Sequence, residues 1–200
     1  MLYTINEVGK SSMKEQRSEF IAFLYPIDDV NKVKEVFSKH NEQYKDATHN
    51  CYAYIIGKKQ EWQYYSDQGE PSGTAGKPIL NMLLKHELTN VLAIVTRYYG
   101  GIKLGVRGLI DAYSEAVELV IQSTDLIEYH AMASLQVTLE YTILESLKHF
   151  LKTHDSSLNV TEYSDNITAE VSFPEEKHNE VNEYLNDLTQ KGLVRIIDSD

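Results

Sequence analysis

Hydrophobic and polar positions along the first 130 residues repeat with the periods of strands and helices. Segments around 3–8 and 18–25 have the composition of strands. Asp28 and Asp29 are candidate caps for a helix whose apolar stripe is formed by Val30, Val33, Val36 and Phe37. A β-hairpin is predicted next, with one arm over 49–57 and the other around Trp62, Tyr64 and Tyr65. These elements predict a layer of sheet and helix.

The middle of the chain predicts two further helices and a buried strand between them. Pro78 suits the first position of a helix that runs to about Glu87, which leaves 72–77 as loop. Residues 91–95 are apolar without interruption, as in a central strand covered on both faces, and the next residues, 97–99, are expected at its carboxyl end. After Gly108 an apolar stripe at helical spacing includes Leu109, Ala112, Tyr113, Ala116, Val117 and Val120.

From about residue 131 the pattern changes to that of a second unit. Alternating apolar positions predict strands over 135–141, 158–160, 167–173 and 193–197. Helical stripes predict one helix that begins at a capping box of Thr142 and Glu145, and another over 181–188 that ends at Gly192. The order βαββαβ is ferredoxin-like. The sequence therefore predicts an α+β protein with domains at 1–130 and 131–200.

Composition is that of an ordinary folded protein, with 42% apolar and 24% charged residues. The amino terminus lacks a signal pattern and no apolar run is long enough for a membrane span, so we expect a cytoplasmic protein with no membrane partner. Cys51 is the single cysteine, which excludes an internal disulfide and a multi-thiolate metal site and suits a reducing compartment. No cofactor or metal is expected.

Glycine and charge are both unevenly distributed. Seven of the ten glycines lie between residues 69 and 108, where backbone freedom or close approach of another molecule is expected. The net charge is −11, of which 131–200 contributes −8, from 13 acidic and 5 basic side chains. Segment 67–108 instead has a net charge of +2, from 5 basic and 3 acidic side chains. This segment permits a local anion site, while the whole chain disfavours broad nucleic-acid affinity.

The loop before the helix at 78 is a candidate anion site. Its free amides and the positive end of the helix dipole would act together with a lysine. The candidate residues are Gly73, Thr74, Ala75, Gly76 and Lys77. The sequence does not match a phosphate-binding P-loop, because Pro71 and Pro78 stand where that motif needs Gly and Ser or Thr. The alternative is a tight turn that packs against the sheet.

The second glycine-rich stretch, residues 97–108, combines an arginine guanidinium, aromatic rings and a mobile backbone. Such groups stack the bases and hold the phosphates of single-stranded RNA. Its candidate residues are Arg97, Tyr98, Tyr99, Gly100, Gly101, Lys103 and Arg107. The alternative is that one tyrosine packs in the core, the other covers it, and the glycines only turn the chain.

Three polar residues outside these sets, His49, Asp67 and Glu70, form a possible further site. Asp67 and Glu70 flank a turn and are a candidate carboxylate pair, although a solvated loop is the favoured interpretation. His49 and Cys51 lie two apart on a predicted strand, which suits a thiolate–imidazole pair or a metal, but a packed histidine and a buried thiol are favoured. No catalytic constellation is evident, so an enzyme is less favoured than a binding protein.

Three motifs resemble those of the IMPACT/YigZ family. They are Gly69-Glu-Pro-Ser-Gly-Thr-Ala-Gly-Lys-Pro78, Val95-Thr-Arg-Tyr-Tyr-Gly-Gly-Ile-Lys-Leu-Gly105 and Leu109-Ile-Asp-Ala-Tyr-Ser114, and Ala47-Thr-His-Asn-Cys-Tyr-Ala-Tyr54 also matches. The resemblance implies a first domain similar to domain 2 of ribosomal protein S5 and to domain IV of elongation factor G. It implies a ferredoxin-like second domain similar to domain V of that factor, and an RNA-associated or translation-associated role.

Three functions follow as hypotheses. The leading one is a non-enzymatic factor that binds RNA or the ribosome through 69–78 and 97–108. The second is an enzyme that acts on a phosphorylated small molecule, with Lys77 and the loop amides as an anion cradle and Asp67 or Glu70 as the base. The third is a protein-docking module whose acidic second domain meets a basic partner. The oligomeric state stays open.

Overall fold

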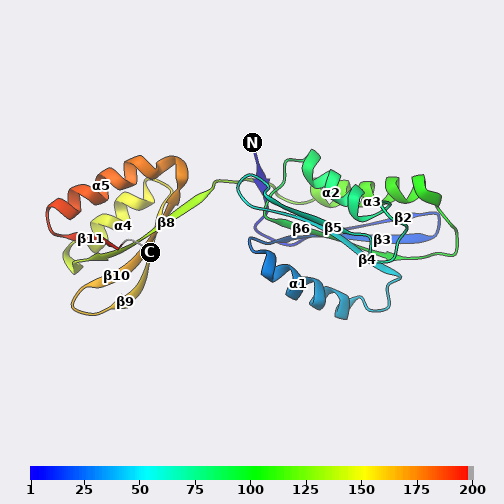
Figure 1. Cartoon of the computed structure of the whole chain (residues 1–200), viewed down its shortest axis with the longest axis horizontal. Coiled ribbons are helices and arrows are strands. Elements are labelled where there is room, and N and C mark those ends of the chain that lie inside the picture. The colour runs from blue at the N-terminus through cyan, green and yellow to red at the C-terminus, as the bar shows by residue number, and fades with distance from the viewer. Residues whose placement is uncertain (198–200) are drawn as a thin grey trace. The chain divides into compact units, whose positions relative to one another are not determined.

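The computed structural model describes residues 1–197, and their contacts divide the chain into two compact units, Met1–Tyr129 and His130–Asp200 (Figure 1). Each unit has its own hydrophobic core. The fold is mixed α+β in both units.

The first unit is built on a five-stranded antiparallel sheet with strand order β2-β3-β6-β4-β5. Its strands are β2 (Gly9–Glu15), β3 (Ser18–Pro26), β4 (His49–Ile56), β5 (Trp62–Ser66) and β6 (Val91–Tyr98). Its helices are α1 (Val30–Gln43), α2 (Gly76–Lys85) and α3 (Gly105–Gln122). A separate two-stranded ladder pairs β1 (Tyr3–Thr4) with β7 (Ile127–Glu128). The β4–β5 hairpin predicted from the alternation is present.

Helices cover both faces of this sheet (Figure 1). Side chains of α2 and α3 pack on one face, in a core that includes Phe20, Ala53 and Val95. On the other face α1 packs through Val33 against Leu92, Ile94 and neighbours. Strand β6 lies between the two layers, and its residues 91–97 are all buried. This explains the uninterrupted apolar run, and the prediction of a central strand covered on both faces is confirmed.

Several predicted boundaries in this unit are wrong. The strand expected over 3–8 is only two residues long, and β2 was missed because half of its side chains are exposed and polar. Helix α2 begins at Gly76, not at Pro78, so Gly76 and Lys77 are helical, not loop. Helix α3 begins at Gly105, not after Gly108. Positions 76 and 105 are both glycines, whose low helix propensity hides these starts in the sequence.

A buried polar cluster ties α1 to the sheet. His40 is 2% exposed, and its ring nitrogens lie 2.9 Å from Tyr25 Oη and 2.7 Å from Thr96 Oγ1. Because the Thr96 hydroxyl donates to Asn50 Oδ1, it accepts from His40 Nε2, and Nδ1 then accepts from Tyr25. The neutral imidazole satisfies both contacts. Burial lowers the pKa of His40 from its ordinary 6.5 to about 4.

We expect this histidine to make the first unit acid-sensitive. The pKa of His40 is lower in the folded state than in the unfolded state. The contribution of this histidine to the free energy of unfolding is therefore fully present above pH 6.5 and is lost as the pH falls towards 4. Between pH 7 and pH 5 the free energy of unfolding should fall by about 2 kcal/mol on this account. Urea titrations at the two pH values, compared with His40→Gln, measure it. An NMR titration in which the His40 ring gains its proton near pH 6.5 would contradict the assignment.

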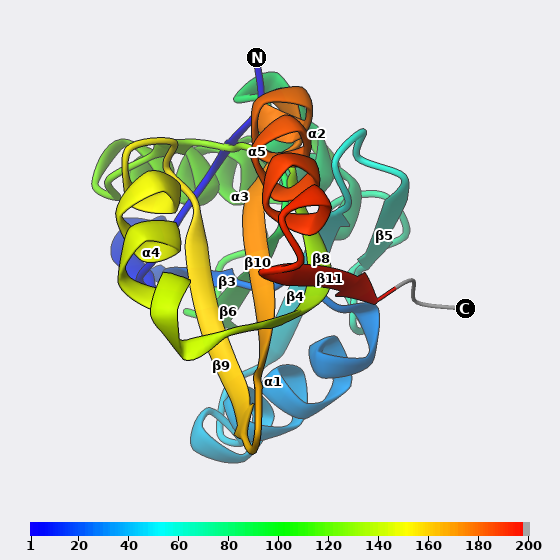
Figure 2. The same ribbon diagram turned by 90° about the vertical axis from the view of Figure 1, so that its left-hand side faces the viewer.

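The second unit is a four-stranded antiparallel sheet with order β11-β8-β10-β9, which with its helices gives the predicted βαββαβ arrangement. Its strands are β8 (Met132–Leu139), β9 (Ser157–Tyr163), β10 (Ile167–Pro174) and β11 (Val194–Ile197), and its helices are α4 (Leu144–Lys152) and α5 (His178–Gln190). Strands β9 and β10 form a long hairpin (Figure 2). Both helices lie on the same face of the sheet (Figure 1).

The first residue of helix α4 differs from the sequence-based prediction. Residues Tyr141–Ile143 form a 3-10 turn, and α4 begins at Leu144 without a side-chain cap. Thr142 donates to Glu140 instead of forming the expected capping box with Glu145. Tyr141, predicted as the end of the strand, belongs to the turn and is exposed.

No helix among residues 1–197 has both the length and the apolar character needed to cross a membrane.

Candidate functional site

A pocket of about 470 Å³ lies in the first unit where the two glycine-rich segments meet. The segment after β5 contributes Glu70 and Pro71, and β4 contributes His49 together with the preceding Thr48. The end of β6 and the start of α3 supply the remaining walls, which are Arg97, Tyr99, Lys103, Leu104, Gly105, Val106 and Leu109. Of the residues singled out from the sequence, His49, Glu70, Arg97, Tyr99 and Lys103 line this pocket.

Arg97 and Glu70 form a buried ion pair at this pocket. The Arg97 guanidinium donates to Glu70 Oε1 over 2.6 Å, and the two side chains are 6% and 3% exposed. The Tyr113 hydroxyl donates to the same oxygen over 2.8 Å, and the other guanidinium arm contacts Ser18 Oγ at 3.3 Å. Burial raises the pKa of Tyr113 well above its ordinary value, so it stays a neutral donor. Arg97 therefore has a structural role, and its guanidinium is not an exposed group.

The second carboxylate oxygen of Glu70 faces His49. Glu70 Oε2 lies 4.0 Å from His49 Nε2, and it has no hydrogen-bond partner among residues 1–197. The other ring nitrogen, Nδ1, lies 2.9 Å from the backbone oxygen of Gln68. Gly69 sits over the same ring, because a Cβ at that position would be 3.3 Å from it. The imidazole is thus held with one edge towards Glu70.

The two neighbouring tyrosines lie on different sides of the sheet. Tyr99 is 44% exposed at the pocket, and the Arg97 guanidinium lies 5.4 Å from the centre of its ring. Tyr98 follows Arg97 on β6, so its side chain points to the opposite face, where its hydroxyl donates to Asp46. Of the two aromatic faces predicted for this segment, only that of Tyr99 lines the pocket.

The amides at the start of α2 are occupied by Asp67. Its carboxylate accepts from the backbone N–H groups of Gly73, Ala75 and Gly76 at 2.8, 3.0 and 2.8 Å. Asp67 therefore supplies the anion that a helix amino terminus favours, and the loop has no free cradle for an external phosphate. Thr74 donates to the backbone oxygen of Pro71, and Lys77 is exposed but does not line the pocket. The expected anion site at 73–77 is not supported, and the tight-turn alternative is.

Gly100 brings a second turn against the rim of the pocket. A Cβ on Gly100 would lie 1.9 Å from the backbone oxygen of Arg17, in the β2–β3 turn, so only glycine allows this approach. The Gly100 amide also donates to Ser18 Oγ. This contact brings the exposed Arg17 next to the segment that contains Lys103 and Arg107, which are also exposed. Arg17 was missed in the sequence because nothing local links residue 17 to residue 100.

Cys51 is fully buried, 3.4 Å from the Tyr113 hydroxyl and 2.9 Å from the Asp67 backbone oxygen. Burial raises the pKa of its thiol to about 12, so it has no thiolate character at neutral pH. The thiolate–imidazole alternative is therefore not supported. Within residues 1–197, no three His, Cys, Asp or Glu side chains are grouped so as to hold a metal ion.

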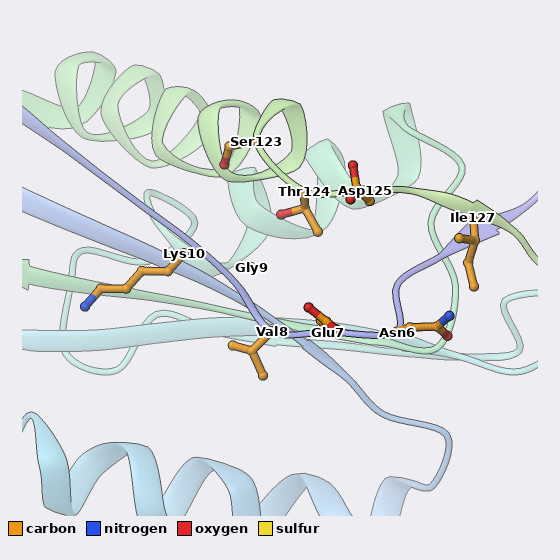
Figure 3. A pocket seen from close by; sticks show the side chains of 9 residues that line it. All are labelled: Asn6, Glu7, Val8, Gly9, Lys10, Ser123, Thr124, Asp125 and Ile127. Atoms are coloured by element: carbon orange, nitrogen blue, oxygen red, sulfur yellow. The ribbon is translucent and has the colours of Figure 1, made fainter.

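A second hollow of about 410 Å³ lies between the β1–β2 connection and the end of α3 (Figure 3). Polar side chains such as Glu7, Thr124 and Asp125 line it, and Gly9 packs so closely on Thr124 that a Cβ would be 2.1 Å from the hydroxyl. Its single cation, Lys10, lies over the Phe23 ring. It lacks the buried charge and exposed aromatic ring that distinguish the first pocket.

Comparison with known proteins agrees with this architecture. The model of the Impact N-terminal domain matches residues 16–121, and that of a domain of unknown function, DUF1949, matches 137–190. The IMPACT family member YvyE of Bacillus subtilis (strain 168) is 36% identical over 187 residues, which cover 94% of this chain and 86% of the relative. The IMPACT family member YigZ of Escherichia coli (strain K12) is 31% identical over 180 residues, 89% and 88% of the two chains.

A solved structure has the same two-unit fold. It is described as the crystal structure of a hypothetical protein, and it superimposes with a TM-score of 0.72 at 27% identity, covering 100% of this chain and 97% of that one. The matched first domain contains the whole pocket, from Thr48 to Leu109. The chain belongs to the IMPACT family.

Proposed function

We propose that this protein is a cytoplasmic, non-enzymatic factor of translation that binds unpaired RNA, ribosomal RNA included, at the pocket of the first unit. The observation that carries the proposal is the half-exposed Tyr99 ring beside a buried cation, in a pocket that the exposed Lys103 also lines. An aromatic face for a base and cations for the phosphates are the elements of single-strand recognition. The link to translation rests on the family resemblance.

The distribution of charge supports RNA contact by the first unit. Residues 131–200 have a net charge of −8. The exposed positions of β8 are Met132, Ser134 and Gln136, so this strand offers neither cations nor aromatic rings for a base. Arg17, Lys103 and Arg107 are instead exposed on segments that meet at Gly100. With a total charge of −11, we expect modest affinity that falls steeply with salt.

The enzyme hypothesis has less support. The carboxylate of Asp67 accepts three amides and is therefore not a free general base. Among residues 1–197, Glu70 keeps only Oε2 without a hydrogen-bond partner, since Oε1 accepts from Arg97 and Tyr113. The backbone amides that the enzyme hypothesis needs to bind a phosphate already donate to Asp67.

Tyr99→Ala is expected to weaken binding of a labelled single-stranded RNA by about 5- to 150-fold, the value of one stacked base. The ring is 44% exposed, so the change should leave folding intact. Tyr64→Ala is the matched control, since Tyr64 is 50% exposed and lies on β5, outside the pocket. Fluorescence anisotropy measures both variants. Equal affinities for the wild type and Tyr99→Ala would contradict the proposal.

Lys103→Ala is expected to lower the slope of log affinity against log salt by about 0.7, the value of one phosphate contact on a single strand. Lys77→Ala removes the same charge from an exposed position outside the pocket and should leave the slope unchanged. The measurement is the same anisotropy titration at several ionic strengths. Identical slopes for Lys103→Ala and Lys77→Ala would assign the salt dependence to net charge and refute the contact.

A further inference from the structure

The buried carboxylate of Glu70 lines the pocket and takes no part in the stacking of a base. Glu70 Oε2 belongs to a side chain that is 97% buried, since 3% is exposed, and none of residues 1–197 donates a hydrogen bond to it. This oxygen is not among the side-chain atoms of residues 1–197 that are fully enclosed without a partner, so it is accessible from the pocket, where a donor on a ligand can replace water. From the geometry of this oxygen and His49, we infer that the pocket binds one unpaired nucleotide whose base carries an exocyclic amino group. The inference rests on the proposed function and names its ligand.

The hydrogen bond of His49 fixes which edge of its ring faces the pocket. The backbone oxygen of Gln68 only accepts, so the contact of 2.9 Å puts the proton on Nδ1. In the neutral ring Nε2 then has a lone pair, and it lies 4.0 Å from Glu70 Oε2, beyond hydrogen-bond reach. Two acceptors therefore face the same space without a donor between them. An amino group has two hydrogens, and a nitrogen about 2.9 Å from each acceptor satisfies both.

The walls fit a planar ring. Leu104, Val106 and Leu109 from the start of α3 are apolar, and Tyr99 offers a partly exposed aromatic face. The volume of about 470 Å³ is within the range of sites for small molecules. A base can enter between these surfaces with its polar edge towards Glu70 and His49.

The charges set the orientation of the ligand. A phosphate would be repelled by the Glu70 carboxylate on the floor, while Lys103 is exposed at the wall formed by the loop before α3. The nucleotide therefore binds with its base inside and its phosphate outside. Adenine, guanine and cytosine have an amino group, whose two hydrogens can reach both acceptors. Uracil has a single donor, N3–H, flanked by two carbonyl oxygens that Glu70 repels, so it cannot satisfy both acceptors. The pocket should discriminate against uracil.

The test uses the full chain and the four nucleoside monophosphates AMP, GMP, CMP and UMP as probes, followed by NMR shifts of the residues around the pocket. We expect the three amino-bearing nucleotides to bind at least about tenfold more tightly than UMP, the value of one hydrogen bond to a charged group. Tyr99→Ala should weaken all four alike because it removes stacking, and Tyr64→Ala should weaken none. Equal binding of UMP and the other three, or no shifts at the pocket, would overturn the inference.

Glu70→Gln is the sharper variant. Its amide oxygen must take the place of Oε1, to accept from Arg97 and Tyr113, so the NH₂ group replaces Oε2 and becomes a donor. The preference should then shift towards UMP, and an unchanged preference would refute the assignment of Oε2. If this variant does not fold, His49→Ala removes the second acceptor and should still reduce the preference against UMP.

Different results would refute the amino-group inference and the proposed RNA binding. RNA binding that depends on Tyr99 together with unselective mononucleotide binding would overturn the amino-group inference and leave the proposed function standing. Selective mononucleotide binding without any RNA binding would support the pocket assignment and refute the proposed function.

Discussion

Arg97→Ala is expected to destabilise the first unit by about 3–5 kcal/mol, because it leaves the Glu70 carboxylate buried without its counter-charge. The two side chains are 6% and 3% exposed, so the charges of the pair are little screened by water. Glu70→Ala should cost a similar amount for the reverse reason. The guanidinium also lies over the rings of Phe20 and Tyr99, at 5.4 Å from each, and this packing is lost as well.

Urea unfolding measures these effects, and the fluorescence of Trp62, the one tryptophan, reports on the first unit. Arg107→Ala is the matched control, since this arginine side chain is 96% exposed and should change stability by less than about 0.5 kcal/mol. The double variant Arg97→Met with Glu70→Leu should recover part of the loss, because it removes both charges and keeps the volume. A stable Arg97→Ala, within about 1 kcal/mol of the wild type, would contradict the buried ion pair.

This expectation changes how RNA binding has to be tested. From the sequence, Arg97 was the natural choice for a phosphate contact, because an arginine beside two tyrosines and two glycines is typical of single-strand recognition. In the structure a loss of binding in Arg97→Ala would report unfolding as much as a lost contact. Tyr99 and Lys103, which are exposed, separate the two effects.

The architecture was largely predictable from the sequence because it rests on local periodicity. The continuous apolar run in β6, the alternation in the β4–β5 hairpin and the βαββαβ order of the second unit each follow from short-range patterns. The errors fall where that signal is weak. Strand β2 is half exposed and polar, and α2 and α3 begin with glycines, which low helix propensity assigns to loops.

The site was less predictable because its contacts are long-range. Nothing local in the sequence indicates that Asp67 caps a helix that begins nine residues later, or that Tyr113 completes the coordination of Glu70. One signal was available and was missed. Had the strand been extended from residue 95 to residue 98, alternation would have put Arg97 and Tyr98 on opposite faces. The resemblance to a family identified the segments but not which side chains within them are exposed.

Gly100→Ala is expected to destabilise the first unit by about 3 kcal/mol, at the upper end of overpacking costs, for a purely steric reason. Its Cβ would be 1.9 Å from the backbone oxygen of Arg17, and a backbone atom cannot rotate away as a side chain can. The β2–β3 turn must therefore move away from the turn that follows β6. Because Tyr99 precedes Gly100, we also expect the pocket to lose nucleotide affinity.

The neighbouring glycine provides the matched control for Gly100→Ala. Gly101 has φ +87°, but nothing lies within 4 Å of its Cβ position, so Gly101→Ala should cost only the strain of a left-handed backbone, about 1–2 kcal/mol. Urea unfolding of both variants separates close approach from backbone conformation. If Gly101→Ala were the more destabilising of the two, the contact between the turns would not hold the pocket together, and Arg17 would have no place at its rim.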